Sequence, residues 1–135
     1  MVHVRGSFVF MTPEAANASK DVIEAVFGVD SVIGIDGCFV EISKYSRDDR
    51  SECLALYANL TPGLVSADIY FERRDDGTFW KDAYIGTDER SYGKWITIPG
   101  VIMFTPPGVV VYPMENATEI NLSGTDPDVS DHDLY

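Results

Sequence analysis

Short turn sequences divide this chain into segments after residue 28, and this punctuation constrains the fold more than any other feature. Asp36-Gly37, Pro62-Gly63, Asp75-Asp76-Gly77 and Pro106-Pro107-Gly108 each favour a reversal of the chain. Between these turns, apolar residues alternate with polar ones, as in strands with one buried face. Short strands joined by turns predict a sheet that is mainly antiparallel.

One helix is predicted ahead of these strands, over Pro13–Phe27. Thr12 is a suitable N-cap, Pro13 suits the first turn, and Gly28 is a natural stop. The face expected to be buried consists of Ala15, Ala18, Val22 and Val26. The predicted fold class is α+β and β-rich. It has a mainly antiparallel curved sheet of about seven to nine strands with one N-terminal helix packed on one face, in the order β-α-β-β-β-β-β-β-β.

Two strand assignments carry specific expectations. Glu52–Leu60 is predicted to be a strand because three of its leucines, Leu54, Leu56 and Leu60, fall on one face at period two. In the next segment the core-facing side is predicted to consist of Val65, Ala67, Ile69 and Phe71. Residues 1–122 are expected to form a single globular domain.

The charge is large, negative and unevenly distributed. The chain has 135 residues with 22 Asp and Glu against 10 Lys and Arg, a net charge of −12. This balance excludes direct binding to nucleic acid and to anionic membranes, both of which attract basic surfaces. Lys94 is the last basic residue, and half of the excess charge follows it. Residues 123–135 have the composition of an acidic, flexible tail.

Nothing in the sequence assigns a catalytic, cofactor-binding or metal-binding residue. The two histidines, His3 and His132, lie near opposite ends of the chain, and no glycine-rich phosphate loop precedes a helix. Cys38 and Cys53 are predicted to be unpaired, and they match no zinc-ligand spacing. Neither a signal peptide nor a transmembrane segment is recognisable, so a cytoplasmic protein is expected.

Aromatic residues in the middle third fit two interpretations. They are either structural aromatics of a curved sheet, which bury a large area, or an exposed recognition patch ringed by acids, which would suit a basic partner. Together with the acidic tail, this patch defines the predicted interaction residues. They are Asp68, Glu72, Asp75, Asp76, Trp80, Asp82, Tyr84, Asp126, Asp128, Asp131 and Asp133.

The leading hypothesis is a non-catalytic acidic protein that binds a basic protein surface, because its charge steers association toward positive grooves. Such grooves occur mostly on nucleic-acid-handling enzymes. One form of this hypothesis is therefore an inhibitor or nucleic-acid mimic of the phage anti-defence or immunity type. Two alternatives stay open. One is a structural or assembly subunit of a larger particle such as a virion, and the other is a small-ligand-binding or enzymatic domain with an aromatic cleft.

Overall fold

The computed structural model describes residues 1–46, 50–86, 93–103 and 108–122. The strands are β1 (Val2–Phe10), β2 (Val32–Asp36), β3 (Phe39–Ser46), β4 (Leu64–Arg73), β5 (Thr78–Ile85), β6 (Lys94–Pro99), β7 (Val101–Ile102), β8 (Val110–Val111) and β9 (Thr118–Glu119). The helices are α1 (Pro13–Phe27) and α2 (Arg50–Leu60), and η1 (Thr61–Gly63) and η2 (Met114–Asn116) are single 3₁₀ turns. These elements confirm the α+β, β-rich fold class.

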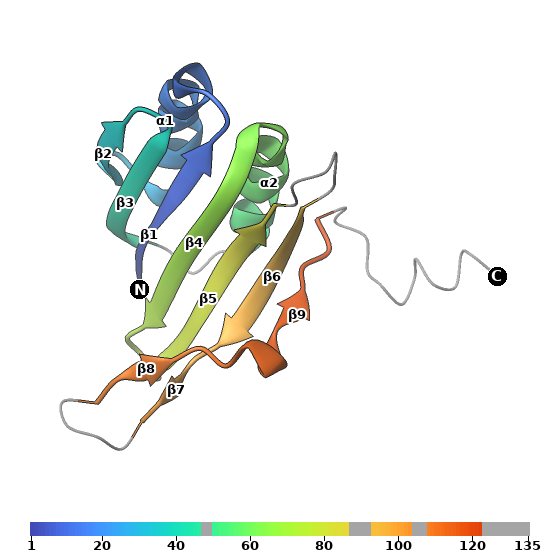
Figure 1. Ribbon diagram of the computed structural model, residues 1–135. Coiled ribbons are helices and arrows are strands. Elements are labelled where there is room, and N and C mark those ends of the chain that lie inside the picture. The colour runs from blue at the N-terminus through green and yellow to red at the C-terminus, as the bar shows by residue number, and fades with distance from the viewer. Residues whose placement is uncertain (47–49, 87–92, 104–107, 123–135) are drawn as a thin grey trace.

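Seven of the strands form one antiparallel sheet in the order β2-β3-β1-β4-β5-β6-β9, and β7 and β8 form a separate pair. Both helices lie on the same face of the large sheet (Figure 1). We call this the covered face and the opposite one the uncovered face. The order β1-α1-β2-β3-α2-β4, with β1 between β3 and β4, is the split βαβ arrangement. β5 and β6 extend it as a meander.

Helix α1 has the predicted limits. Thr12 Oγ1 accepts a hydrogen bond from the Ala15 backbone N–H at 3.1 Å, and Gly28 adopts a positive φ at the other end. The buried face differs from the prediction, since it consists of Ala16, Ser19, Ile23 and Phe27. Of the expected residues, Ala18 is exposed and the other three are only partly buried. Both faces have helical spacing, but turning Ile23 and Phe27 inward buries more apolar area than turning in the two valines.

Helix α2 corrects the prediction of a strand over Glu52–Leu60, which was wrong. The buried residues recur at helical spacing, namely Cys53, Leu56, Tyr57 and Leu60. The three leucines lie at even-numbered positions, so they fit the alternation of a strand. The helical period of 3.6 becomes visible only when Cys53 and Tyr57 are counted among the buried residues. The described residues therefore place two helices against the sheet instead of one. Cys38 and Cys53 form no disulfide bond in the part of the chain that the structure describes.

Strand β4 supports the predicted core face at three of four positions. Ala67, Ile69 and Phe71 are buried, whereas Val65 is 46% exposed. A register shift against β1 explains this exception, because Phe10 pairs with Leu64 while Val9 pairs with Ser66. The extra residue forms a β-bulge, which leaves Val65 out of the alternation.

Two of the predicted turns form hairpins where expected. β2 and β3 are joined through Gly37, which has φ 61°, and Asp36 pairs with Phe39 across the turn. β4 and β5 are joined by the Asp75-Asp76-Gly77 turn, where Gly77 has φ 71°. Glycine adopts these left-handed conformations without the steric cost that a Cβ would bring. The β4–β5 turn also sets the register that decides where the predicted interaction residues point.

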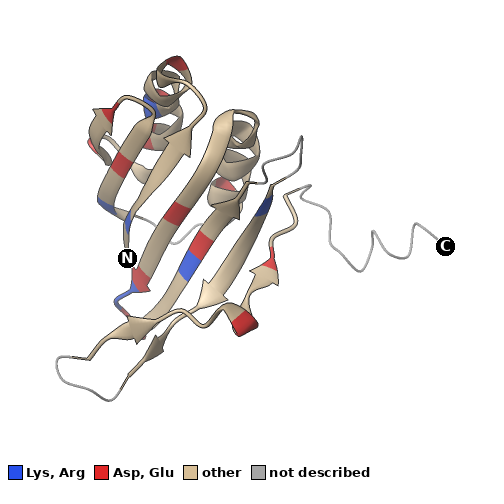
Figure 2. Ribbon diagram, in the orientation of Figure 1, with Lys and Arg blue, Asp and Glu red and all other residues tan. Residues whose placement is uncertain are grey.

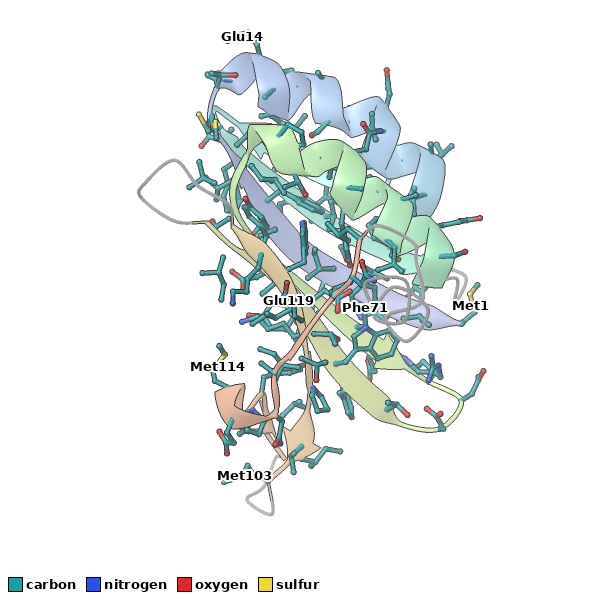
Figure 3. The ribbon with its side chains drawn as sticks, turned by 90° about the vertical axis from the view of Figure 1, so that its right-hand side faces the viewer. Met1, Glu14, Phe71, Met103, Met114 and Glu119 are labelled. Atoms are coloured by element: carbon teal, nitrogen blue, oxygen red, sulfur yellow. The ribbon has the colours of Figure 1, made fainter. Side chains whose placement is uncertain are left out.

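A smaller apolar cluster covers part of the other side of the sheet. Ala83, Ile96 and Ile98 are buried there against Tyr112 and Ala117. The chain after β8 therefore returns across the uncovered face at β5 and β6. Figure 3 shows Met103 and Met114 at the end of the molecule away from the helices. Neither helix in the described ranges has both the length and the apolar character needed to span a bilayer.

Candidate interaction surface

Four of the predicted interaction residues lie on β4 and in the turn that follows it. Asp68 and Glu72 alternate with the buried residues of β4 and therefore belong to the uncovered face. Asp75 and Asp76 lie in the β4–β5 turn, where both are exposed. Figure 2 shows these acidic positions along one strand and at one end of the sheet. The structure thus brings these four carboxylates into one region.

Each of these carboxylates also has a positive partner within the chain. The ion pairs join Asp68 to Lys81 (2.9 Å), Glu72 to Arg74 (3.8 Å), Asp75 to the terminal amine of Met1 (3.7 Å) and Asp76 to Arg73 (3.7 Å). Pairs this exposed contribute little stability. They do cancel charge locally, so the β4 acids present little surplus negative charge to a partner.

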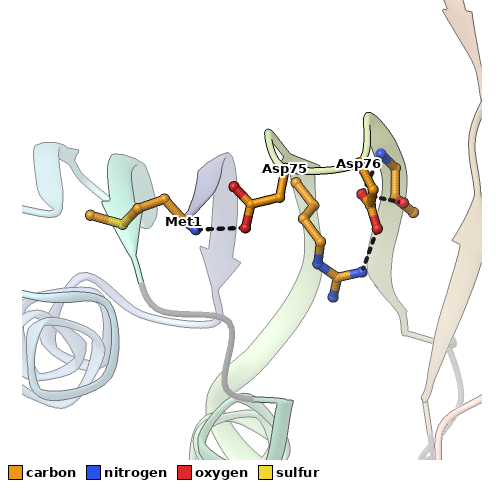
Figure 4. Close-up of polar contacts among 5 residues, drawn as sticks. Met1, Asp75 and Asp76 are labelled. Atoms are coloured by element: carbon orange, nitrogen blue, oxygen red, sulfur yellow. Dashed lines mark hydrogen bonds and ion pairs between the residues drawn. The ribbon is translucent and has the colours of Figure 1, made fainter.

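The Asp76 carboxylate has a second set of contacts inside the turn (Figure 4). Thr78 donates to Asp76 Oδ1 twice, from its hydroxyl at 2.6 Å and from its backbone N–H at 3.0 Å. These hydrogen bonds, followed by the charge of Arg73, hold the pKa of Asp76 below its ordinary value of 3.8. The carboxylate closes the turn and is ionised at neutral pH.

A different set of carboxylates carries uncompensated charge. These residues are Glu14, Asp21, Asp30, Asp36 and Glu41, and we call them the acidic edge. All are exposed, on α1, the α1–β2 loop, β2 and β3, which together form one side of the molecule in Figure 2. Within the described ranges none of them makes an ion pair.

Two of the described cations near these carboxylates have other partners, and a third, Arg5, lines a hollow together with Glu41 but makes no ion pair with it. The Lys20 ammonium lies 3.6 Å from Glu24, and Lys44 Nζ donates to the backbone carbonyl of Val29 at 2.7 Å. A partner that approaches the acidic edge therefore meets free carboxylates first. Electrostatic attraction at this edge would favour a positively charged surface.

Three predicted interaction residues lie on the covered face instead of an exposed one. These residues occupy every second position of β5, and the side chains of Trp80, Asp82 and Tyr84 therefore all point toward the helices. Trp80 lies directly opposite the inward-facing Phe71, and their rings stack at 4.8 Å. Asp82 is 0% exposed and Tyr84 is 7% exposed. Neither is accessible to a protein partner in this structure.

The buried carboxylate of Asp82 belongs to a polar network between α2 and the sheet. The Tyr57 hydroxyl donates to Asp82 Oδ2 at 2.6 Å. Trp95 Nε1 donates to the Thr61 hydroxyl at 2.8 Å, and the Thr61 hydroxyl donates to the Tyr57 carbonyl. The Tyr57 and Trp95 rings stack at 4.0 Å. Because the network is enclosed by apolar side chains, we interpret it as a structural link between α2, β5 and β6.

Other aromatic residues occupy the uncovered face, each beside a cation of this chain. Arg74 donates to the Tyr45 hydroxyl at 2.7 Å, and Lys81 lies 5.3 Å from the Tyr70 ring centre. The Tyr112 ring meets Tyr70 edge-on at 5.4 Å, and burial raises the pKa of Tyr112. A hollow of about 280 Å³ lies here, lined in part by His3, Arg5, Glu72 and Arg74. It is a mixed-charge surface and differs in character from the acidic edge.

Comparisons with known proteins leave the function to be argued from this geometry. A scan against protein-family models gives no match, and searches of curated proteins and of solved structures find no significant match. Among the described residues, no group of three His, Cys, Asp or Glu side chains is placed to hold a metal ion. The remaining predicted residues, Asp126, Asp128, Asp131 and Asp133, lie outside the described residues.

The sequence contained one signal that could have predicted the burial of Trp80, Asp82 and Tyr84. The Asp75-Asp76-Gly77 turn makes the numbers of paired residues sum to 151, so an inward-facing Phe71 requires an inward-facing Trp80. Alternation then carries Asp82 and Tyr84 inward as well. The acidic edge had no such signal. In the sequence, the carboxylates of the acidic edge look the same as the paired carboxylates of β4. That they make no ion pair with Lys20 or Lys44 follows from where these two lysines lie in three dimensions.

Proposed function

We propose that this chain is a non-catalytic protein-binding domain that docks through its acidic edge onto a basic protein surface. The supporting observation is the contrast between two sets of carboxylates. Those on β4 and its turn are paired with cations of the chain, whereas those of the acidic edge make no ion pair with a described residue. Unpaired surface carboxylates are available to cations of a partner, and they accelerate association with it.

Basic surfaces of the required extent are most common on proteins that handle nucleic acid. We therefore propose a nucleic-acid-handling protein as the partner, with this domain acting as an inhibitor of its basic groove. A mimic of the phosphate backbone is the narrower form of this proposal. Carboxylates on α1, β2 and β3 would have to occupy positions that phosphates take in the natural ligand.

The experiment compares two triple variants that change the net charge equally, from −12 to −9. The edge variant is Asp30→Asn, Asp36→Asn and Glu41→Gln. The matched control neutralises three paired acids, through Asp68→Asn, Glu72→Gln and Asp76→Asn. The tagged wild-type and variant chains are used to capture proteins from the source organism, with washes at low and high salt, followed by mass spectrometry.

We expect a basic protein that is retained by the wild type and by the control, and that is lost from the edge variant and in high salt. Binding of the purified partner should weaken about tenfold in the edge variant, since each exposed charge pair contributes up to about 1 kcal/mol. Equal retention by both variants, or binding that salt does not weaken, would show that the acidic edge is not the docking surface.

A further inference from the structure

One hollow on the uncovered face gathers arginines in a protein that has few basic residues. This hollow of about 280 Å³ is lined by Arg5 and Arg74 against one acid, Glu72, together with His3. In the whole chain Asp and Glu outnumber Lys and Arg by 22 to 10. The balance of charge in the hollow is therefore the reverse of that of the chain. We call it the cationic hollow.

The register of β1 against β4 sets the floor of the cationic hollow. His3 pairs with Glu72, and Arg5 pairs with Tyr70. His3 and Arg5 alternate with the buried valines of β1, so their side chains extend from the uncovered face. Both strands lie in the interior of the sheet and are paired on both sides. The floor is therefore rigid, as a binding site requires.

The two arginines differ in what their guanidinium groups contact. Arg74 donates to the Tyr45 hydroxyl at 2.7 Å and lies 3.8 Å from the Glu72 carboxylate. The exposed side chain of Arg5 makes no ion pair and no hydrogen bond within the described part of the chain. A guanidinium stays charged at physiological pH, and its fork of N–H donors fits the paired oxygens of a carboxylate or a phosphate. Arg5 is therefore available to hold an anion.

The wall of the cationic hollow is aromatic. The Tyr112 ring meets the Tyr70 ring edge-on at 5.4 Å, and Phe79 lines the hollow beside them. Burial and the neighbouring Tyr70 raise the pKa of Tyr112, and the charge of Arg5 acts against this rise. Arg5 and Tyr112 are therefore close enough to contact one ligand. A planar ring packs well on aromatic side chains arranged in this way.

We propose that the cationic hollow binds a small molecule in which a carboxylate or a phosphate group is attached to a planar ring. The Arg5 guanidinium holds the anionic group, and the ring packs on Tyr70, Phe79 and Tyr112. A volume of about 280 Å³ is at the small end of ligand pockets, so it suits one ring with its anionic group. This binding goes beyond the proposed function, because no carboxylate of the acidic edge lines the hollow.

The test is an NMR titration of the ¹⁵N-labelled full chain with five defined probes at constant pH and in low salt. Phenyl phosphate and benzoate carry both a ring and an anionic group. Phenol carries the ring alone, and inorganic phosphate and acetate carry the charge alone. The backbone amides of Arg5, Tyr70 and Tyr112 report on binding at the cationic hollow, and amides elsewhere report on binding at other places.

Three variants separate the contribution of the guanidinium from that of net charge. Arg5→Gln removes the guanidinium, and Arg5→Lys keeps the charge but loses the planar fork. The matched control is Lys20→Gln, which changes the net charge by the same amount as Arg5→Gln. Lys20 lies on α1, on the other face of the sheet (Figure 1). The amide spectrum of each variant without a probe checks that it is folded.

We expect phenyl phosphate, benzoate or both to shift the amides of the cationic hollow saturably, with dissociation constants in about the millimolar range or below. Phenol and the two ring-free anions should bind at least about fivefold more weakly. Arg5→Gln should weaken binding of the ring-bearing anions about tenfold and Arg5→Lys less, whereas Lys20→Gln should stay within about twofold. The tighter of the two ring-bearing probes identifies the preferred anionic group.

Three results would overturn the inference. The first is that neither ring-bearing anion shifts the amides of the hollow saturably at up to about 20 mM. The second is that phenol or a ring-free anion binds as tightly as they do, and the third is that Arg5→Gln and Lys20→Gln weaken binding equally. None of these results bears on the proposed function, because capture of a basic protein by the acidic edge uses neither Arg5 nor these probes.

Discussion

The hydrogen bond between Tyr57 and Asp82 offers a direct test of how α2 is attached to the sheet. Tyr57→Phe removes one hydroxyl and keeps the ring, so the stacking on Trp95 at 4.0 Å is preserved. Both residues are 0% exposed, and the hydroxyl donates to the carboxylate at 2.6 Å. The change therefore removes a buried hydrogen bond to Asp82, with no loss of apolar packing.

The expected magnitude follows from that geometry. Removing one partner of a buried hydrogen bond costs about 1–3 kcal/mol, because the polar group that is left behind keeps its desolvation cost. We expect Tyr57→Phe to lower the free energy of unfolding by about 2–3 kcal/mol. In a chain of this length such a loss corresponds to a decrease in melting temperature of roughly 10 °C.

The assay is urea-induced unfolding followed by tryptophan fluorescence, since Trp95 is buried and Trp80 packs against the core. The matched control is Tyr45→Phe, which removes a hydroxyl that accepts from Arg74 at 2.7 Å in an exposed position. The control should cost no more than about 0.5 kcal/mol, because water replaces an exposed partner. A loss below about 0.5 kcal/mol for Tyr57→Phe would refute the structural role assigned to the Asp82 network.

Three further outcomes are expected. Phe71→Ala should cost about 3–5 kcal/mol in urea unfolding, because it removes a buried ring stacked on Trp80, and a negligible cost would mean that this face is not the core. Thr78→Ala should raise the pKa of Asp76 toward 3.8 in an NMR titration of the carboxyl carbon, and an unchanged pKa would show that Thr78 does not set it. The lowered pKa also has a sign for stability: the Asp76 contribution is present at neutral pH and is lost as the pH falls through the folded-state pKa. Deletion of residues 124–135 should leave the melting temperature unchanged, and a decrease of several degrees would show that the tail packs on the body.

Local signals in the sequence were sufficient for several parts of the fold. The limits of α1 follow from Thr12, Pro13 and Gly28, which act on the backbone of their immediate neighbours. The hairpin at Gly37 follows from the freedom of glycine at positive φ. The inward direction of Phe71 follows from strand alternation. Each of these features depends on residues only a few positions apart, so a single sequence contains enough information to predict it.

Helix α2 and the orientation of β5 required information from farther along the chain. The apolar residues of α2 fit either period, and packing of Leu56 and Tyr57 under the sheet selected the helix. Trp80 and Asp82 have polar or amphipathic side chains that suit either face of a strand. Their burial depends on pairing with β4 and on the Tyr57 hydroxyl. The strand propensity of a residue is a weak guide to the face on which it lies, because tertiary contacts can compensate the cost of burying a polar group.

The net charge and its distribution along the chain were determined by the sequence alone, and the hypothesis of a basic partner rests on them. Which carboxylates remain available to that partner was decided by the tertiary structure. Lys81, Arg74 and Arg73 lie beside the β4 acids because β4 and β5 form a hairpin, whereas Lys44 is turned to the Val29 carbonyl. Coulombic interactions depend on distance in space, and the separation of residues along the chain does not determine that distance.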